Sequence, residues 1–330
     1  LTATVEPDDA SNKAVTWVSD KPAIATVNNG VVTGQALGTA VITVTTQDGS
    51  FQATCTVVVR TANPRTWHVT QNGAGNKDAS DWANAAANLK DIMDIAESDD
   101  QVWVAAGTYS PGGDVMDTFL LKKGVKVYGG FAGDEASVDA RDWATNKTTL
   151  NGNSRNWHVV TGQGGATTDD TRLDGFTITG GNANGDAENG GGMHNSSSSP
   201  TVANCTFTAN TANMNGGGMC NDLSSPAVEN CVFSGNTARY GYGGGMYNAK
   251  LSSGPNNPRL ENCVFSGNTA NDGGGMYNDG SSPAVEGCAF SGNTAYSFGG
   301  GMYNKRSSPT VTNCTFSGNT ANMYGGGMRN

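Results

Sequence analysis

The sequence predicts an all-β chain, in which a small β-sandwich precedes a parallel β-helix with a capping helix at its N-terminal end. The main observation is a repeat: the string GGGMYN returns with small changes, and its methionine recurs every 26–30 residues from Met193 to Met328. A fixed period of this size is typical of a solenoid. The repeats lack apolar residues at helical spacing and are rich in Val, Phe, Thr, Tyr and Cys. They are therefore short strands separated by turns.

Residues 1–60 form the first predicted domain, in which apolar and polar residues alternate without the repeat. Asn29-Gly30 and Asp48-Gly49 are strong signals for tight hairpin turns, and Trp17 is the one large core candidate. The segments AVTWVSDKPAIATV and NGVVTGQALGTAVITVTT, with a closing strand that carries Cys55, resemble the bacterial immunoglobulin-like group 2 module. The resemblance implies a spacer or adhesin module of bacterial surface proteins, here expected to lack its first strand.

Residues 61–330 form the second predicted domain, which begins with a cap over about residues 65–110. Trp67 to Val69 is expected as a first strand. A helix is expected next, with Ser80-Asp81 as its start signal. It would cover the open end of the coil stack, where strand edges are otherwise unpaired. The apolar residues at helical spacing are Leu89, Ile92, Met93 and Ala96. The early coils that follow carry Leu173, Phe176 and Ile178 at the later Val, Cys and Phe positions.

Each regular repeat, over about residues 186–330, is predicted to make one coil of three short strands. Stacked coils pair these strands in parallel and in register, which brings like residues together in ladders. The inward ladders are Val202, Val228, Leu260, Val285 and Val311; Cys205, Cys231, Cys263, Cys288 and Cys314; Phe207, Phe233, Phe265, Phe290 and Phe316; and the methionines. Corner asparagines can hydrogen-bond to the same amide one coil up: Asn236, Asn268, Asn293, Asn319, Asn248, Asn278 and Asn304.

The cysteines are predicted to be free and buried, because parallel side-chain vectors make disulfide geometry poor. Cys220, which replaces a tyrosine of the repeat, is expected to face outward. The net charge of −10, without a Lys/Arg stripe, argues against a nucleic-acid partner. No apolar run approaches the length of a transmembrane segment. The chain is expected to be a monomeric piece of a longer protein, cut at its C-terminus.

The repeat strings FSGN and GGGM resemble the FxxN and GGA[ILV] pair of chlamydial polymorphic outer membrane proteins. The stretch from Trp67 through YGGFAG is similar to predicted secreted β-helix proteins of environmental and gut bacteria. Together these resemblances cover roughly residues 65–330 and imply a right-handed, pectate-lyase-like parallel β-helix in an extracellular or bacterial cell-surface protein. They imply adhesion for some members and no reaction.

Enzymes also use this fold, and pectate lyases and polygalacturonases need clustered carboxylates with a Lys or Arg nearby. Glu229, Glu261 and Glu286 recur at one outward position, where no Lys or Arg shares the column. A solvated face is therefore expected. A second acidic patch, formed by Asp169, Asp170 and Asp174, is either a solvated loop with Arg172 as countercharge or a calcium site.

No catalytic residue, metal ligand or cofactor is predicted, because His68, His158 and His194 are scattered and no triad spacing occurs. The candidate binding surface is the outward column after Met, namely Tyr247, Tyr277 and Tyr303. Aromatic faces can pack against a sugar ring or a protein, or the stack can simply support the sheet.

The predicted function is a secreted or surface-displayed structural or adhesion protein that binds a glycan or a partner protein. The alternative is a polysaccharide lyase or glycoside hydrolase whose active coils lie outside this fragment. More of the same repeats and an anchor beyond Asn330 would favour the first function, and a clustered Asp/Lys/Arg patch there would favour the second.

Overall fold

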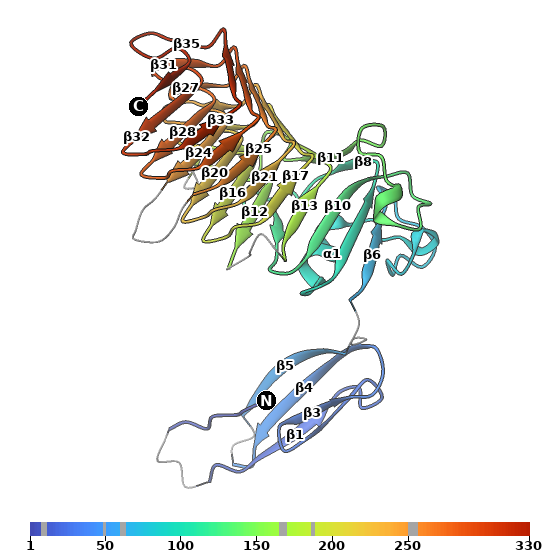
Figure 1. The fold of residues 1–330 in the computed structure, drawn as a ribbon. Helices are drawn as coiled ribbons and strands as arrows, with labels where there is room; N and C mark the ends of the chain where they lie inside the picture. The colour runs from blue at the N-terminus through green and yellow to red at the C-terminus, as the bar shows by residue number, and fades with distance from the viewer. Residues whose placement is uncertain (8–11, 49–50, 60–63, 165–169, 186–188, 250–256) are drawn as a thin grey trace. The chain divides into compact units, whose positions relative to one another are not determined.

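The computed structural model describes residues 1–7, 12–48, 51–59, 64–164, 170–185, 189–249 and 257–330. The chain divides into two compact units, Leu1–Pro64 and Arg65–Asn330. The first unit is a small antiparallel β domain, and the second is a parallel β-solenoid (Figure 1).

In the first unit, the predicted turn at Asn29-Gly30 is confirmed, because both residues have the positive φ that a two-residue hairpin turn requires. Trp17 is only half-buried. The predicted Asp48-Gly49 turn extends beyond the described residues. Fully buried core positions are Ala25, Ala40 and Ile42. This unit has a three-stranded sheet in the order β1 (Val15–Ser19), β4 (Gly38–Thr46), β5 (Gln52–Val59), and a separate two-stranded hairpin of β2 (Ala25–Asn28) and β3 (Val31–Gly34).

The solenoid begins with the predicted cap. Strand β6 (Thr66–Val69) pairs in parallel with β7 (Gln101–Ala105), and α1 (Leu89–Ile95) packs against β7 and β9 (Phe119–Leu121). The apolar face of α1 joins the core of the coils. Among the described residues, no helix has the length and apolar character that crossing a bilayer requires.

The predicted start of the capping helix is wrong. Asn88 caps α1, because its side chain accepts hydrogen bonds from the backbone N–H groups of Lys90 and Asp91. Asp81 instead caps the short 3₁₀ helix η1 (Trp82–Asn84). A second 3₁₀ helix, η2 (Val138–Ala140), lies between the early coils.

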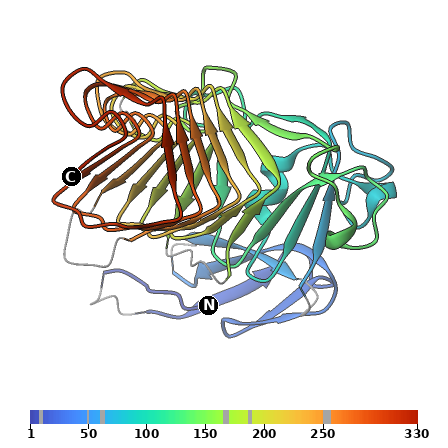
Figure 2. The same cartoon turned by 45° about the horizontal axis from the view of Figure 1, so that its top comes forward.

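Within the described part of the solenoid, the strands form four parallel sheets, which we number in the order in which the chain passes through one coil. The coils stack so that each strand lies beside its counterpart in the next coil (Figure 2). The first sheet consists of β6, β7, β10 (Lys126–Phe131), β13 (Arg172–Asp174), β17 (Thr201–Ala203), β21 (Ala227–Glu229), β25 (Arg259–Glu261), β29 (Ala284–Glu286) and β33 (Thr310–Thr312). The second consists of β8 (Gly107–Tyr109), β11 (Thr148–Asn151), β14 (Phe176–Thr179), β18 (Thr206–Thr208), β22 (Val232–Ser234), β26 (Val264–Ser266), β30 (Ala289–Ser291) and β34 (Thr315–Ser317).

The third sheet corrects the prediction of three strands per coil. Each regular coil has an additional short strand that begins with Thr-Ala, and its alanine is buried in most coils. The third sheet consists of β15 (Asn182–Ala183), β19 (Thr211–Ala212), β23 (Thr237–Ala238), β27 (Thr269–Asp272), β31 (Thr294–Phe298) and β35 (Thr320–Ala321). The fourth consists of β9, β12 (Val160–Gln163), β16 (Met193–Ser196), β20 (Met219–Asp222), β24 (Met246–Ala249), β28 (Met276–Asp279), β32 (Met302–Lys305) and β36 (Met328–Arg329).

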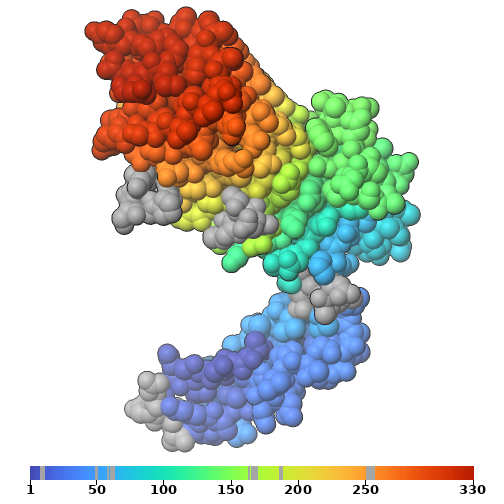
Figure 3. All heavy atoms as spheres, viewed as in Figure 1, coloured from blue at the N-terminus to red at the C-terminus, as the bar shows by residue number. Residues whose placement is uncertain are grey.

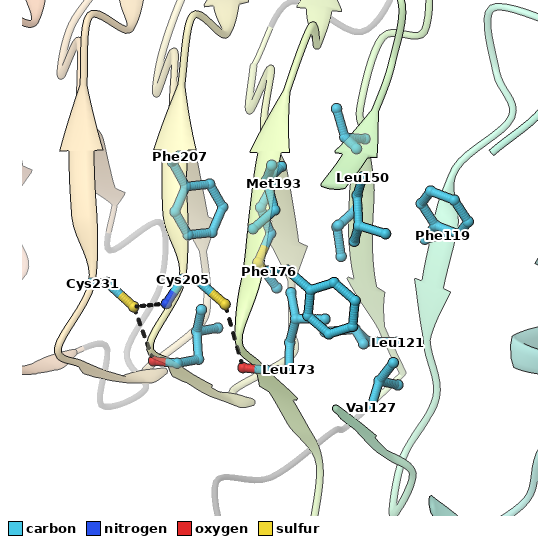
Figure 4. Close-up of a cluster of buried hydrophobic side chains, with 14 of the residues drawn as sticks. Phe119, Leu121, Val127, Leu150, Leu173, Phe176, Met193, Cys205, Phe207 and Cys231 are labelled. Atoms are coloured by element: carbon cyan, nitrogen blue, oxygen red, sulfur yellow. Dashed lines mark hydrogen bonds between the residues drawn. The ribbon is translucent and has the colours of Figure 1, made fainter. Parts of the chain in front are cut away.

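The predicted ladders fill the interior of the coils. Successive phenyl rings of the Phe ladder stack nearly parallel, at 3–4°, with centroids 4.7–4.8 Å apart. The ladder cysteines are free, and burial raises the pKa of the Cys231 thiol well above its ordinary value. Figure 4 shows Cys231 accepting a hydrogen bond from the backbone N–H of Cys205, with Phe207 and Leu173 beside them. The interior therefore consists of stacked apolar side chains and free cysteine thiols.

Two buried asparagine ladders confirm the predicted amide pairing. Each amide nitrogen donates to the side-chain oxygen of the next coil at 2.7–3.1 Å. The side chains in the middle of both ladders are completely buried. The first ladder runs through Asn210, Asn236, Asn268, Asn293 and Asn319, and the second through Asn195, Asn221, Asn248, Asn278, Asn304 and Asn330.

Candidate functional site

The outer face of the fourth sheet carries one column of side chains, which lie on the side opposite to the methionines. Parallel pairing places these residues in register on neighbouring strands, as the sequence predicts. The order along the column is Thr161, His194, Cys220, Tyr247, Tyr277, Tyr303 and Arg329. We call it the outer column.

The prediction that the outer column faces water is wrong for its middle part. Tyr247 is 9% exposed, Tyr277 1% and Cys220 0%. They form a second small core outside the coil, in which the ring of Tyr242 stacks on Tyr277 at 4.7 Å. Burial raises the pKa of both column phenols. Tyr247 and Tyr277 therefore offer no open ring face to a ligand.

The glycine triplets explain this burial. Gly273, the first residue of its triplet, has a left-handed φ of 61°, and a Cβ there would lie 2.8 Å from Cβ of Tyr277. Glycine adopts this conformation without a steric penalty, so the chain can pass directly over the column residue. The residue before a triplet can then lie against the outer column, as Tyr242 does on Tyr277 of the next coil.

One aromatic group of this face does reach the surface. Tyr303 is half-buried, and its ring centroid lies 5.8 Å from that of Phe298, which in turn stacks on Tyr324 at 6.0 Å. The Arg329 guanidinium lies 4.5 Å from the Phe298 ring centroid. We call these four residues the aromatic edge; they belong to the last coils, coloured orange to red in Figure 3. The sequence feature that indicates the aromatic edge is a Tyr or Phe directly before several of the Gly triplets.

The structure also brings together residues that the sequence leaves scattered. His194, Cys220 and Asp222 each offer a potential ligand atom, and these atoms all lie within 4.8 Å of one another. Nε2 of His194 lies 3.0 Å from Oδ2 of Asp222. The ring of His158 lies 5.0 Å from that of His194, and its Nδ1 lies 2.9 Å from the carbonyl oxygen of Gly190. We call His194, Cys220 and Asp222 the His-Cys-Asp cluster.

The electrostatics of this cluster do not favour a nucleophilic cysteine. Burial, and then the nearby Asp222 carboxylate, raise the pKa of the Cys220 thiol well above its ordinary value. The reactive form of cysteine is the thiolate, so a neutral thiol that is completely buried cannot attack a substrate. Burial lowers the pKa of His158 to about 4, so this imidazole is neutral near pH 7. His68 lies elsewhere, packed against Trp82 and Trp103.

One residue of the predicted acidic patch, Asp174, is not solvated. Asp174 is buried and paired with Arg141 at 2.8 Å and with Arg172 at 2.7 Å, so its carboxylate serves a salt-bridge network. Asp170 is exposed, and Asp169 lies outside the described residues. The predicted countercharge at Arg172 is thus confirmed, and Asp174 is occupied without calcium.

The glutamate column of the first sheet forms as predicted: Glu229, Glu261 and Glu286 pair in register. Arg259 lies two residues before Glu261, in register with Ala227 and Ala284 and so outside this column. Its Nη2 lies 2.7 Å from Oε2 of Glu261. Both side chains are solvent-exposed, so the ion pair contributes little to stability.

Curated relatives match short parts of the chain. A 109-residue segment is 40% identical to an α-L-arabinofuranosidase of Bifidobacterium longum subsp. longum, covering 33% of this chain and 9% of that enzyme. A 61-residue segment is 51% identical to an Ig-like virion protein of Serratia phage KSP90, covering 18% of this chain and 24% of that protein. An uncharacterized protein of Clostridium acetobutylicum is 52% identical over 66 residues, 19% of this chain and 7% of the relative. The chain thus spans less than a quarter of each relative.

A solved structure and three families also match. The chain aligns with pectate lyase Pel9A at 15% identity and a TM-score of 0.39, over 77% of this chain and 79% of that one. Residues 1–57 match the bacterial Ig-like domain (group 2), and residues 242–328 the right handed beta helix region, which confirms both predicted modules. Residues 88–281, more than half of the chain, match a third family. The chain therefore belongs to the family described as protein of unknown function (DUF1565).

Proposed function

We propose that this chain is part of a secreted or surface-displayed bacterial protein with a structural or adhesive role. The observation that carries the proposal is the pairing of a bacterial Ig-like module with a solenoid whose described interior is filled by side-chain ladders. Such a solenoid is rigid and offers its outer faces for contact. The similarity to an Ig-like virion protein supports a structural role for part of the chain.

The aromatic edge is the surface we propose for binding, in place of the full tyrosine column. Phe298 stacks in parallel with Tyr324, and the Tyr303 ring lies beside Phe298. Flat aromatic faces pack against sugar rings. The Arg329 guanidinium lies over the Phe298 and Tyr324 rings, where its N–H groups can donate to a sugar hydroxyl beside the aromatic faces. A neutral glycan fits this combination; a partner protein is the other candidate ligand.

Replacing Tyr303 and Tyr324 together by Ala should weaken binding to a glycan selected on a glycan array by about tenfold or more. Each lost aromatic contact contributes about 0.5–1.5 kcal/mol beyond its buried area. Isothermal titration of the full chain measures the change. Tyr240→Ala is the control, because Tyr240 is 69% exposed and makes none of the contacts of the aromatic edge. Equal affinities for the double variant and the unchanged chain would contradict this assignment.

The second candidate function is that of a polysaccharide lyase or glycoside hydrolase, which the similarity of one segment to an arabinofuranosidase favours. A lyase needs a base and a cation held together at the substrate carboxylate. Arg259 is instead bound to the candidate base Glu261. We expect no unsaturated products from polygalacturonate or alginate, with or without calcium, measured by ultraviolet absorbance. Product release that Glu261→Gln abolishes would establish the enzyme instead.

A further inference from the structure

We propose that His194, Cys220 and Asp222 bind a zinc ion on the outer face of the fourth sheet. Thiolate sulfur, imidazole nitrogen and carboxylate oxygen are the donors that zinc prefers in proteins. The three ligand atoms already lie within 4.8 Å of one another. Donors bound to one zinc lie roughly 3–4 Å apart, as expected for tetrahedral bonds of about 2.0–2.3 Å. Side-chain adjustments of about an ångström therefore suffice to close the site.

The backbone holds these donors in place. His194 lies on β16, and Cys220 is its direct partner on β20. Asp222 follows two residues after Cys220, so its side chain points to the same face of the strand. Parallel pairing to the neighbouring coils on both sides fixes the two strands. The ligand set is therefore preorganised by the same register that builds the core.

Three protein ligands leave a fourth zinc position open, which a water molecule can fill. The chemistry of the donor set and the spacing of its three ligand atoms therefore carry the proposal.

The site is accessible to an ion. The side chains of His194 and Asp222 are 24% and 21% exposed, whereas Cys220 is buried beneath them. Zinc would displace the thiol proton of Cys220, which leaves to solvent, and form a sulfur–zinc bond. The negative charge of the thiolate and of Asp222 would then be balanced by the metal.

The site would replace aromatic packing in two coils. Further along the outer column, Tyr247, Tyr277 and Tyr303 contact one another through their rings. His194 and Cys220 occupy the same register positions in the two preceding coils, and the position of Asp222 is taken by Ala249 in the next coil. A zinc ion would therefore connect β16 to β20 where the tyrosine contacts end.

The test is cobalt and zinc binding to the full chain after metal removal. One equivalent of Co²⁺ should produce a thiolate-to-cobalt charge-transfer band, and Zn²⁺ should displace it. Cys220→Ser should abolish the band. Asp222→Ala should weaken zinc binding about 100-fold or more, because changing only an outer partner of a zinc ligand already costs about 10–100-fold. Competition with a chelating dye measures the affinity.

Cys55→Ser is the matched control, because Cys55 is an exposed free thiol and the obvious competing ligand. This variant should keep both the band and the affinity. Asp222→Ala places at this position the residue found at Ala249, so the fold tolerates it and the test survives if Cys220→Ser misfolds. A band that persists in Cys220→Ser, or disappears in Cys55→Ser, would overturn the proposal. Unchanged zinc affinity in Asp222→Ala would overturn it too.

Discussion

Phe265→Ala should lower the free energy of unfolding by about 3–5 kcal/mol, the usual cost of removing a large aromatic side chain from a core. Phe265 is completely buried, and its ring stacks between Phe233 and Phe290 at 4.8 and 4.7 Å. Parallel pairing on both sides holds the backbone, so neighbouring coils cannot collapse into the cavity. Guanidinium unfolding followed by circular dichroism measures the loss.

Two tyrosine variants serve as comparisons for the stability loss in Phe265→Ala. Tyr296 is 54% exposed, so Tyr296→Ala should change stability by no more than about 0.5 kcal/mol. Tyr277 lies outside the coil but is 1% exposed, so Tyr277→Ala should cost about as much as Phe265→Ala. A loss at Tyr277 as small as that at Tyr296 would contradict the covered outer core. A small loss at Phe265 would contradict the Phe ladder.

The interior of the solenoid could be predicted from sequence because two regular signals coincide there. A period near 26 residues places equivalent residues one above the other, and alternation within each strand assigns them to a face. Cys231 and Phe233 share a face because they lie two residues apart, and the repeat extends this to every coil. The same reasoning predicted both asparagine ladders. The repeat period thus determines which ladder a residue joins, and the alternation determines whether its side chain points into the coil or away from it.

Exposure on the outer face could not be predicted in this way. Alternation shows that Tyr277 points away from the coil, but not whether another segment covers it. Tyr277 is covered because the chain passes directly over it at Gly273. Glycine permits this path, but the repeat period carries no information about it. The predicted start of the capping helix was wrong because the sequence offers two good N-cap residues. Asp81 caps the 3₁₀ helix η1, and Asn88 caps α1.

The His-Cys-Asp cluster was missed because it depends on register between coils that differ. Aligning the methionines already pairs His194 with Cys220, so that part of the signal was present. Asp222 has Ser196 and Ala249 at its neighbouring positions, so no repeat marks it. Sites on a repeat protein arise where a ladder departs from its consensus, and the repeat signal is weakest at those positions.

Asn268→Leu should be among the most damaging single changes in this chain, at about 4 kcal/mol or more. The side-chain nitrogen of Asn268 donates to the carbonyl of Phe233 at 2.8 Å and to Oδ1 of Asn293 at 2.9 Å. Its oxygen accepts from the backbone and side-chain nitrogens of Asn236, both at 3.0 Å. Leucine has the same number of side-chain heavy atoms but none of these bonds. Four buried hydrogen bonds are then lost, at about 0.5–1.5 kcal/mol each, and the backbone N–H of Asn236 loses its side-chain acceptor.

Guanidinium unfolding of this variant should be compared with Asn271→Leu in the same coil. Asn271 makes one exposed hydrogen bond, to the carbonyl of Tyr240 at 2.6 Å, so its loss should cost about 0.5–1.5 kcal/mol. Both changes add the same apolar side chain to the same strand region, so their difference isolates the buried amide ladder. Equal losses would mean that the ladder contributes nothing beyond packing. The expected difference would instead show that hydrogen-bonded asparagines, together with the stacked phenylalanines, hold neighbouring coils in one register. That register also brings His194 beside Cys220.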